Sequence, residues 1–270
     1  MRWLLVVGVV GLVGGCGEVR EVAENQFEPI TPGTLVVAAE VPAIGFWEGT
    51  PDAVTGGFEY ALAQALAAEL DLDLEVAQVP FDAVVAGRLG PADLALQEIS
   101  VTEPRRRLVD FSVPYLVTAP TVVARRGSGE AAELRDLATA RDLTWAVRPG
   151  TTQAEFLRAV VRPDDAPLEV ATQGDALAAV EDGRVDAALV DLSDALHAAA
   201  GSDTLVAAAR FDQTQAVAAA LPSGSTRNVT AVDQAMRALE ADGTIERLIG
   251  TWLDTSYATD ADQLPVIHTR

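Results

Sequence analysis

The chain has 270 residues and a formal net charge of −21, with 40 acidic side chains against 19 arginines and no lysine. Contacts to phosphate need clustered cations, and the longest basic run is Arg105-Arg106-Arg107, so a nucleic acid is excluded as an expected partner and an anionic lipid surface is disfavoured. The length exceeds one average domain core but falls short of two full ones, which predicts two small lobes.

The N-terminus has the form of an export signal. Arg2 precedes an apolar run over residues 3–13, which is too short to span a bilayer. Leu12-Val13-Gly14-Gly15-Cys16 resembles the bacterial lipobox, in which the chain is cleaved before a cysteine that is then acylated. We therefore expect a lipoprotein signal peptide over residues 1–15, and acylated Cys16 with a flexible acidic tether over residues 16–30. This predicts an extracytoplasmic protein, anchored by lipid to the cell membrane. With a single cysteine, no internal disulfide can form.

After the tether, short apolar runs alternate with helical periods. Residues 35–39 have the pattern of a buried strand, and apolar side chains from residue 58 to residue 70 recur at i, i+3 and i+4, which predicts a helix. A strand over 74–79, a helix over 81–88 and a strand over 93–96 continue the series. This alternation predicts an α/β domain.

A second alternating series follows. It comprises strands over 143–147, 168–170 and 186–190, helices from residue 151 and over 175–181, and two final helices over 229–239 and 245–252. Two extended apolar stretches, 119–124 and 205–209, lie where the chain could cross between two lobes.

Several motifs in a fixed order resemble a known family. The stretch 93–105 reads DLALQEISVTEPR and is followed by VDFSVPY at 109–115, while VTGGFE at 54–59, GTTQ at 150–153 and GTIERL at 243–248 match as well. Over roughly residues 34–253 the chain resembles the bacterial extracellular solute-binding proteins of family 3, the amino-acid receptors of ABC importers. The resemblance implies the two-lobed periplasmic-binding-protein fold of type II, in which two crossing strands join two α/β lobes that close over a ligand.

The resemblance also implies a division of the chain and a function. Lobe 1 is expected at residues 31–119 plus 214–255, lobe 2 at 120–213, and a C-terminal tail at 256–270. The implied function is to capture a polar amino acid and deliver it to the permease subunits of an ABC transporter. We expect a monomer that uses no cofactor and no metal and is not an enzyme.

Four residues correspond to positions that hold the charged ends of a free amino acid. Arg105 matches the carboxylate-binding arginine, whose guanidinium can make two parallel hydrogen bonds, and Ser100 matches a second contact to that carboxylate. Thr152 lies at the start of a predicted helix, where free backbone N–H groups favour an anion. Asp191, at the carboxyl end of a predicted strand, matches the ammonium-binding aspartate. The structural alternatives are a surface arginine for Arg105 and helix capping for Thr152 and Asp191.

Four further residues are expected around the ligand side chain. Phe81 matches an aromatic that packs on the ligand stem, Glu40 an acid near the end of the first strand, and Arg148 a basic position of glutamine-type receptors. Glu98 stands where many relatives have a small residue. Their structural alternatives are core packing for Phe81, a solvated loop acid for Glu98 and an exposed loop cation for Arg148.

A second aromatic position of the family falls near Ile44, which weakens the expectation of a clamp of two rings, although Phe46 or Trp47 could take its place. The two predicted side-chain acids, set against Arg148, leave a formal charge of −1 around the ligand side chain, which disfavours an anionic side chain. A glutamine-like or an arginine-like ligand is therefore expected, and the sequence leaves the choice between them open.

An enzyme is the alternative function. Dehydratases of cyclohexadienyl or prephenate type share this fold, but the acid that they use aligns with Ala154, and Glu155 lies one position away, which counts against catalysis. The sequence has no nucleophile elbow, phosphate loop or metal-binding motif, and His197 and His268 are isolated. A fused sensor or cell-wall-lytic protein would need an additional domain, which we do not expect.

Overall fold

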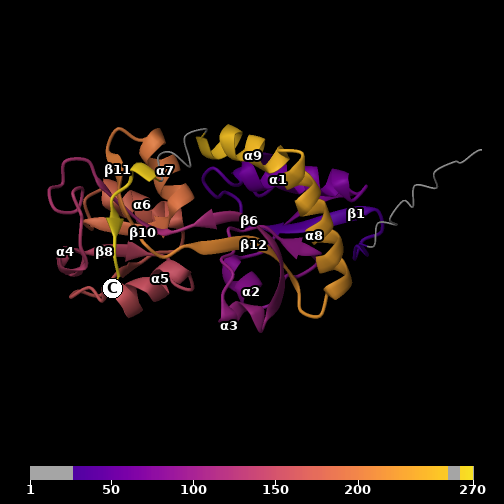
Figure 1. Ribbon diagram of the computed structural model, residues 1–270, viewed down its shortest axis with the longest axis horizontal. Coiled ribbons are helices and arrows are strands. Elements are labelled where there is room, and N and C mark those ends of the chain that lie inside the picture. Colours follow the sequence, from indigo (N-terminus) through magenta and orange to yellow (C-terminus); the bar gives the residue numbers. More distant parts are fainter. Residues whose placement is uncertain (1–26, 255–261, 270) are drawn as a thin grey trace, which may run out of the picture.

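The computed structural model describes residues 27–254 and 262–269, so the predicted signal peptide, Cys16 and most of the predicted tether lie outside the described residues. Figure 1 shows the described elements in two groups, side by side along the long axis of the molecule. In chain order the elements are β1 (Thr34–Ala39), β2 (Glu48–Thr50), β3 (Ala53–Gly56), α1 (Phe58–Glu69), β4 (Asp73–Gln78), α2 (Phe81–Val85), β5 (Leu94–Ala95), α3 (Glu103–Arg106), β6 (Val109–Thr118), β7 (Pro120–Arg125), α4 (Leu137–Asp142), β8 (Trp145–Val147), α5 (Thr152–Phe156), the π-helix η1 (Leu157–Val161), β9 (Leu168–Glu169), α6 (Gln173–Glu181), β10 (Ala187–Asp191), α7 (Leu192–Gly201), β11 (Leu205–Phe211), β12 (Gln215–Pro222), α8 (Thr226–Ala241), α9 (Thr244–Ile249), the π-helix η2 (Gly250–Asp254) and β13 (Val266–Ile267).

Two mixed sheets form the centres of the two lobes. Lobe 1 is built on a five-stranded sheet in the order β4-β1-β5-β12-β6, and lobe 2 on a six-stranded sheet in the order β13-β11-β7-β10-β8-β9. In lobe 1, β1 runs parallel to β4 and β5, whereas β12 is antiparallel to β5 and β6. The predicted fold class, two α/β lobes of the periplasmic-binding-protein type, is confirmed.

Each sheet is covered by helices on both faces, which explains why its central strands are continuously apolar rather than alternating. In β1, Leu35 and Val37 lie in one core cluster with residues of α1 and α8, while Val36 and Ala38 lie in another with residues of α2. Figure 1 shows α1, α8 and α9 on one side of the five-stranded sheet and α2 on the other. The residues of β10 alternate in the same way. Ala187 and Leu189 lie in one core cluster, and Ala188 and Val190 lie in another.

The chain passes between the sheets at two places. It leaves lobe 1 at the end of β6 and enters β7 after a single residue, Ala119, and it returns between the end of β11 at Phe211 and the start of β12 at Gln215. The two apolar stretches that we expected near the crossings are β7 and β11 themselves, which pair with each other in antiparallel register.

Two segments at the ends of the chain contact the lobes in ways that the sequence did not suggest. Phe27, expected in the flexible tether, is buried in the core of lobe 1, and the Glu28 amide donates to Asn228 Oδ1 at 2.9 Å. In the expected C-terminal tail, β13 pairs parallel to β11 of lobe 2. In both segments an apolar side chain, Phe27 or Ile267, gains burial that outweighs the cost of ordering a short piece of chain.

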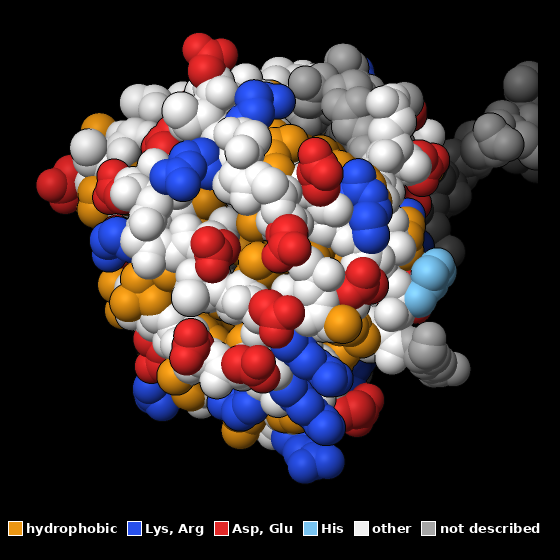
Figure 2. Space-filling view, turned by 90° about the vertical axis from the view of Figure 1, so that its left-hand side faces the viewer, with side chains coloured by type: hydrophobic (Ala, Val, Ile, Leu, Met, Phe, Trp, Pro, Cys, Tyr) orange, Lys and Arg blue, Asp and Glu red, His pale blue; other side chains and the backbone are white. Residues whose placement is uncertain are grey.

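The surface agrees with the acidic composition. On the face shown in Figure 2, at the lobe 2 end of the molecule, acidic side chains are spread widely with arginines among them. Across residues 27–254 and 262–269, the structure contains no helix that is both long enough and apolar enough to pass through a membrane.

Candidate functional site: a cleft between the lobes

A cavity of about 400 Å³ lies between the two lobes. Its walls come from the loop after β1, the segment between β5 and α3, the loop after β8, and the first turns of α5, α6 and α7. The residues that line it are Glu40, Val41, Pro42, Ala43, Ile44, Trp47, Glu59, Phe81, Gln97, Glu98, Ser100, Arg105, Arg148, Thr151, Thr152, Gln153, Thr172, Gln173, Gly174, Asp175, Leu177, Asp191 and Asp194. All eight residues predicted for the ligand site are among them.

Arg105 projects from α3 into the cleft and is 8% exposed. Thr102 caps this short helix by accepting from the Arg105 amide, and the guanidinium donates to the carbonyl oxygen of Ser100 at 3.0 Å and to that of Gly150 at 3.2 Å. Burial lowers the pKa of Arg105, although nearby carboxylates oppose the shift. Among the described residues no carboxylate forms an ion pair with it. A surface arginine, the alternative interpretation, is therefore wrong.

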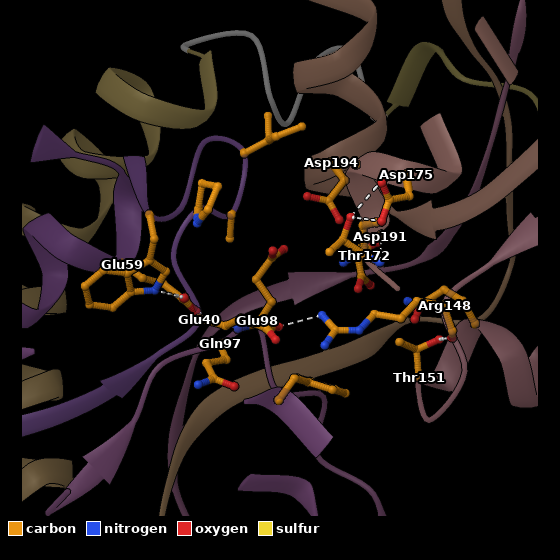
Figure 3. Close-up of a pocket in the computed structure, with 18 of the residues that line it drawn as sticks. Glu40, Glu59, Gln97, Glu98, Arg148, Thr151, Thr172, Asp175, Asp191 and Asp194 are labelled. Carbon is orange, nitrogen blue, oxygen red and sulfur yellow. Dashed lines mark hydrogen bonds and ion pairs between the residues drawn. The ribbon is translucent and has the colours of Figure 1, made fainter. Parts of the chain in front are cut away.

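Arg148 connects the lobes across the mouth of the cleft. Its Nη1 lies 2.7 Å from Glu40 Oε2, an ion pair visible in Figure 3. The Arg148 guanidinium also lies over the Phe81 ring, 4.9 Å from its centroid, and the Arg105 guanidinium lies 5.4 Å from the same centroid. Arg148 is thus not an exposed loop cation. Phe81 both packs in the core of lobe 1 and presents its ring to two cations, a favourable arrangement because the ring face is electron-rich.

The two threonines that start α5 have different partners. Thr151 is the residue that caps the helix, since its hydroxyl accepts from the Ala154 amide and donates to the Arg148 carbonyl. The Thr152 hydroxyl instead donates to Gln215 Oε1 of lobe 1 at 2.8 Å. Helix capping, the alternative for Thr152, is therefore wrong, and its hydroxyl joins the two lobes.

Asp191 and Asp194 face the cleft from the start of α7. Asp191 occupies the N-cap position but makes no side-chain capping bond, so capping does not explain this aspartate. Burial raises the pKa of Asp191 to about 6, against the opposing effects of hydrogen bonds from Thr118 and Gln153 and of the Arg105 charge. Burial, followed by the charges of Asp191 and Glu59, places the pKa of Asp194 well above its ordinary value.

Glu98 reaches toward these two aspartates from lobe 1. Its backbone has φ of 50°, in the left-handed region that costs free energy for a residue with a side chain, and its amide donates to Glu59 Oε1 at 2.7 Å. Its carboxylate accepts from the Ser193 hydroxyl at 3.1 Å. Burial and the charges of Asp194 and Asp191 raise the pKa of Glu98 well above the ordinary value. Glu98 is therefore not the solvated loop acid of the alternative interpretation.

Glu59, on α1, supports this arrangement from behind. It is fully buried, and its carboxylate accepts from the Trp47 indole at 2.8 Å, from the Tyr115 hydroxyl and from the Glu98 amide. Burial raises the pKa of Glu59 to about 7 despite these three hydrogen bonds. The adjacent Gly57, at φ of 109°, allows the close chain approach that brings Trp47 to Glu59, because a Cβ atom there would lie 2.2 Å from a backbone oxygen.

Sequence reasoning missed several residues of the cleft, chiefly Glu59, Gln97, Asp175 and Asp194. Asp194 could have been found, because residues three apart share a face of a helix, and helix capping is the alternative considered for Asp191. Of the suggested second aromatics, Phe46 and Trp47 both pack in the core of lobe 1, and Trp47 also lines the cleft. Glu155, considered as a displaced catalytic acid, is exposed and is not among the residues that line the cavity.

Comparison with known proteins identifies the fold and its family. Residues 35–255 match the model of the bacterial extracellular solute-binding proteins, family 3. The chain belongs to this family. Within it, the chain is 27% identical to the L-cystine-binding protein TcyJ of Escherichia coli strain K12 over 255 residues, which cover 92% of this chain and 94% of that protein.

Two further matches are a solved structure and a second curated protein. A Streptococcus pneumoniae amino acid ABC transporter substrate-binding protein, bound to L-arginine, aligns with a TM-score of 0.72 and 26% identity over 84% of this chain and 94% of that one. The membrane-bound lytic murein transglycosylase F of Ectopseudomonas mendocina is 30% identical over 91% of this chain. The chain spans about half of that transglycosylase, since the match covers 51% of it.

Proposed function

We propose that this family 3 protein is the substrate-binding component of an ABC importer, capturing a polar amino acid in the cleft and delivering it to a membrane permease. One observation carries the proposal: a buried guanidinium, Arg105, and a buried carboxylate, Asp191, face the same cavity from different lobes. A free amino acid carries one carboxylate and one ammonium, and burying either charge without a partner is costly. The two residues supply one partner for each end.

The charge of the wall selects among amino acids. Six carboxylates line the cavity against two guanidiniums, and one of these guanidiniums is already paired with Glu40. The wall is thus more acidic than the sequence suggested, which disfavours aspartate and glutamate as ligands. We place an arginine-like ligand ahead of a glutamine-like one, because a solved relative of 26% identity is bound to L-arginine.

The proposed location is outside the cytoplasm, with the domain held at the membrane by acylated Cys16. The lipobox-like sequence ending at this cysteine and the family's extracellular character support the proposal. A binding protein held close to its permease raises the local concentration of loaded receptor.

The test is a thermal-shift panel of the common amino acids, followed by calorimetry with the best ligand. A ligand at 100 times its dissociation constant stabilises the folded protein by about 2.7 kcal/mol. Arg105→Ala should weaken binding by about 10²-fold or more, because it leaves the ligand carboxylate buried without its partner. Arg107→Ala, which removes an exposed arginine of the same segment, is the matched control and should bind as wild type. Binding by Arg105→Ala within a few-fold of wild type would overturn the assignment.

A further inference from the structure

Three carboxylates from the two lobes converge at one point of the cleft. One oxygen each of Glu98, Asp191 and Asp194 lies within 4.8 Å of the other two. Figure 3 shows Glu98 on one side of the cavity and the two aspartates on the other. Like charges at this distance repel, so the cluster needs a compensating cation or protons.

Two oxygens of this cluster are buried and have no partner. Asp191 is 4% exposed and Asp194 is 5% exposed, and neither Asp191 Oδ1 nor Asp194 Oδ2 receives a hydrogen bond from the described residues. Buried carboxylate oxygens without donors are costly, and native proteins keep few of them. Both aspartates line the cavity, so a ligand that brings N–H donors to these oxygens would satisfy them.

The three oxygens are close enough together for one ammonium group to reach all of them. Because they lie within 4.8 Å of one another, a nitrogen at the centre of an equal-sided triangle would be no more than about 2.8 Å from each, within the reach of a charged N–H···O hydrogen bond. A protonated primary amine has three N–H bonds, one for each carboxylate. Ca²⁺ prefers six to eight oxygen ligands, so three carboxylates alone suit it less well.

We propose that Asp194 completes, with Glu98 and Asp191, a three-carboxylate site that binds the ammonium group of the ligand and restricts the ligand to primary amines. This inference rests on the proposed function, because it takes the ligand to be an amino acid. An N-methylated amine has only two N–H bonds and would leave one buried carboxylate unpaired. Its methyl group would also occupy the space of a hydrogen bond.

The two lobes hold the site in different ways. Asp191 is the N-cap residue of α7 and Asp194 lies three residues further in the first turn, so the start of the helix presents both to the cleft. Glu98 comes from lobe 1, where its bond to Glu59 fixes the backbone and the Ser193 hydroxyl of lobe 2 anchors its carboxylate. The complete site therefore exists only with the lobes together, which couples recognition of the ammonium group to closure.

The experiment measures discrimination between amines by calorimetry, with L-arginine, L-glutamine and their Nα-methyl derivatives as probes. Wild type should bind the better of the two amino acids at least about 10-fold more tightly than its Nα-methyl derivative, because an unpaired buried acceptor is costly. Asp194→Ala should weaken binding of the unmethylated ligand by about 10-fold and reduce the preference over the methylated one by a similar factor. Asp203→Asn, which neutralises an exposed acid of lobe 2, should preserve both values.

Each result has a distinct meaning. If wild type binds neither amino acid nor any member of the common panel, the proposed function and this inference fall together. If wild type binds and Asp194→Ala keeps the full preference for the primary amine, the inference alone is overturned. Calorimetry repeated with EDTA or with added Ca²⁺ tests the cation: a requirement for Ca²⁺ would replace the ammonium site by a metal site. Should Asp194→Ala fail to fold, Asp194→Asn provides the same comparison, because it removes the charge while retaining the size of the side chain.

Discussion

The buried carboxylate of Glu59 makes the stability of the unliganded protein depend on pH. Its pKa is raised from the ordinary value of 4.5 to about 7, chiefly by burial. Between these two values the folded protein holds a proton that the unfolded chain has lost, so the free energy of unfolding falls as the pH rises. At 1.36 kcal/mol per pH unit the whole interval corresponds to about 3 kcal/mol, of which about 2 kcal/mol is lost between about pH 5.5 and about pH 7.5.

Calorimetric unfolding of ligand-free protein at these two pH values measures the effect, with Glu59→Gln as the variant that cannot titrate. The melting temperature should fall by about 4–8 °C more in wild type than in Glu59→Gln over this interval, using about 2–4 °C per kcal/mol for a chain of this size. Glu69→Gln, at the exposed end of the same helix, is the matched control and should behave as wild type.

Glu98 and Asp194 also have pKa values well above the ordinary value, partly because of the charge of Glu59, so Glu59→Gln removes that part of their shift together with the titration of Glu59 itself. Exposed acids with a lowered pKa, such as Asp136 and Glu181, ionise below the interval. Asp191 titrates inside it, with a pKa of about 6, but contributes to wild type and to both variants. Parallel pH curves for wild type and Glu59→Gln would refute the reasoning, because they would mean that Glu59 is already ionised throughout.

Three further predictions address the anchor, the cross-cleft ion pair and a turn. Cys16→Ser should prevent acylation and move the protein from the membrane fraction to the soluble fraction in its native host; a wild-type protein that is itself unacylated would contradict the lipoprotein proposal. Glu40→Gln removes the ion-pair partner of Arg148. Because this pair is partly exposed, the free energy of unfolding should fall by less than about 1 kcal/mol in urea titrations. A loss several times larger would mean that the pair holds the lobes together. Gly57→Ala should lower the free energy of unfolding by more than about 3 kcal/mol in the same assay, since its Cβ atom would overlap a backbone oxygen. Gly201→Ala is the control and should change stability little, because a Cβ atom there meets nothing within 4 Å. Equal effects of the two substitutions would exclude the overlap as the cause.

Much of the fold was predictable because hydrophobic periodicity is a local property. Continuous apolar runs such as 35–39 and 186–190 indicated strands buried on both faces, and the spacing from residue 58 onward indicated an amphipathic helix. The residues expected to face the ligand were also placed in one cleft, because a family motif carries positions that the fold brings together. Their contact with a ligand stays a prediction.

The sequence by itself therefore determined the order of strands and helices, the α/β class, the acidic balance and the candidates Arg105 and Asp191. Only the tertiary structure decided what surrounds them. Glu98 and Asp194 are far apart along the chain and meet only because two lobes face each other, and no periodicity encodes the distance between separate lobes. The left-handed backbone of Glu98 is equally non-local, since the buried carboxylate of Glu59 holds it in a conformation that local propensity disfavours. Burial then sets the charge of the site, because the same carboxylate that is ionised in an unfolded chain binds its proton more tightly once water has been removed from it.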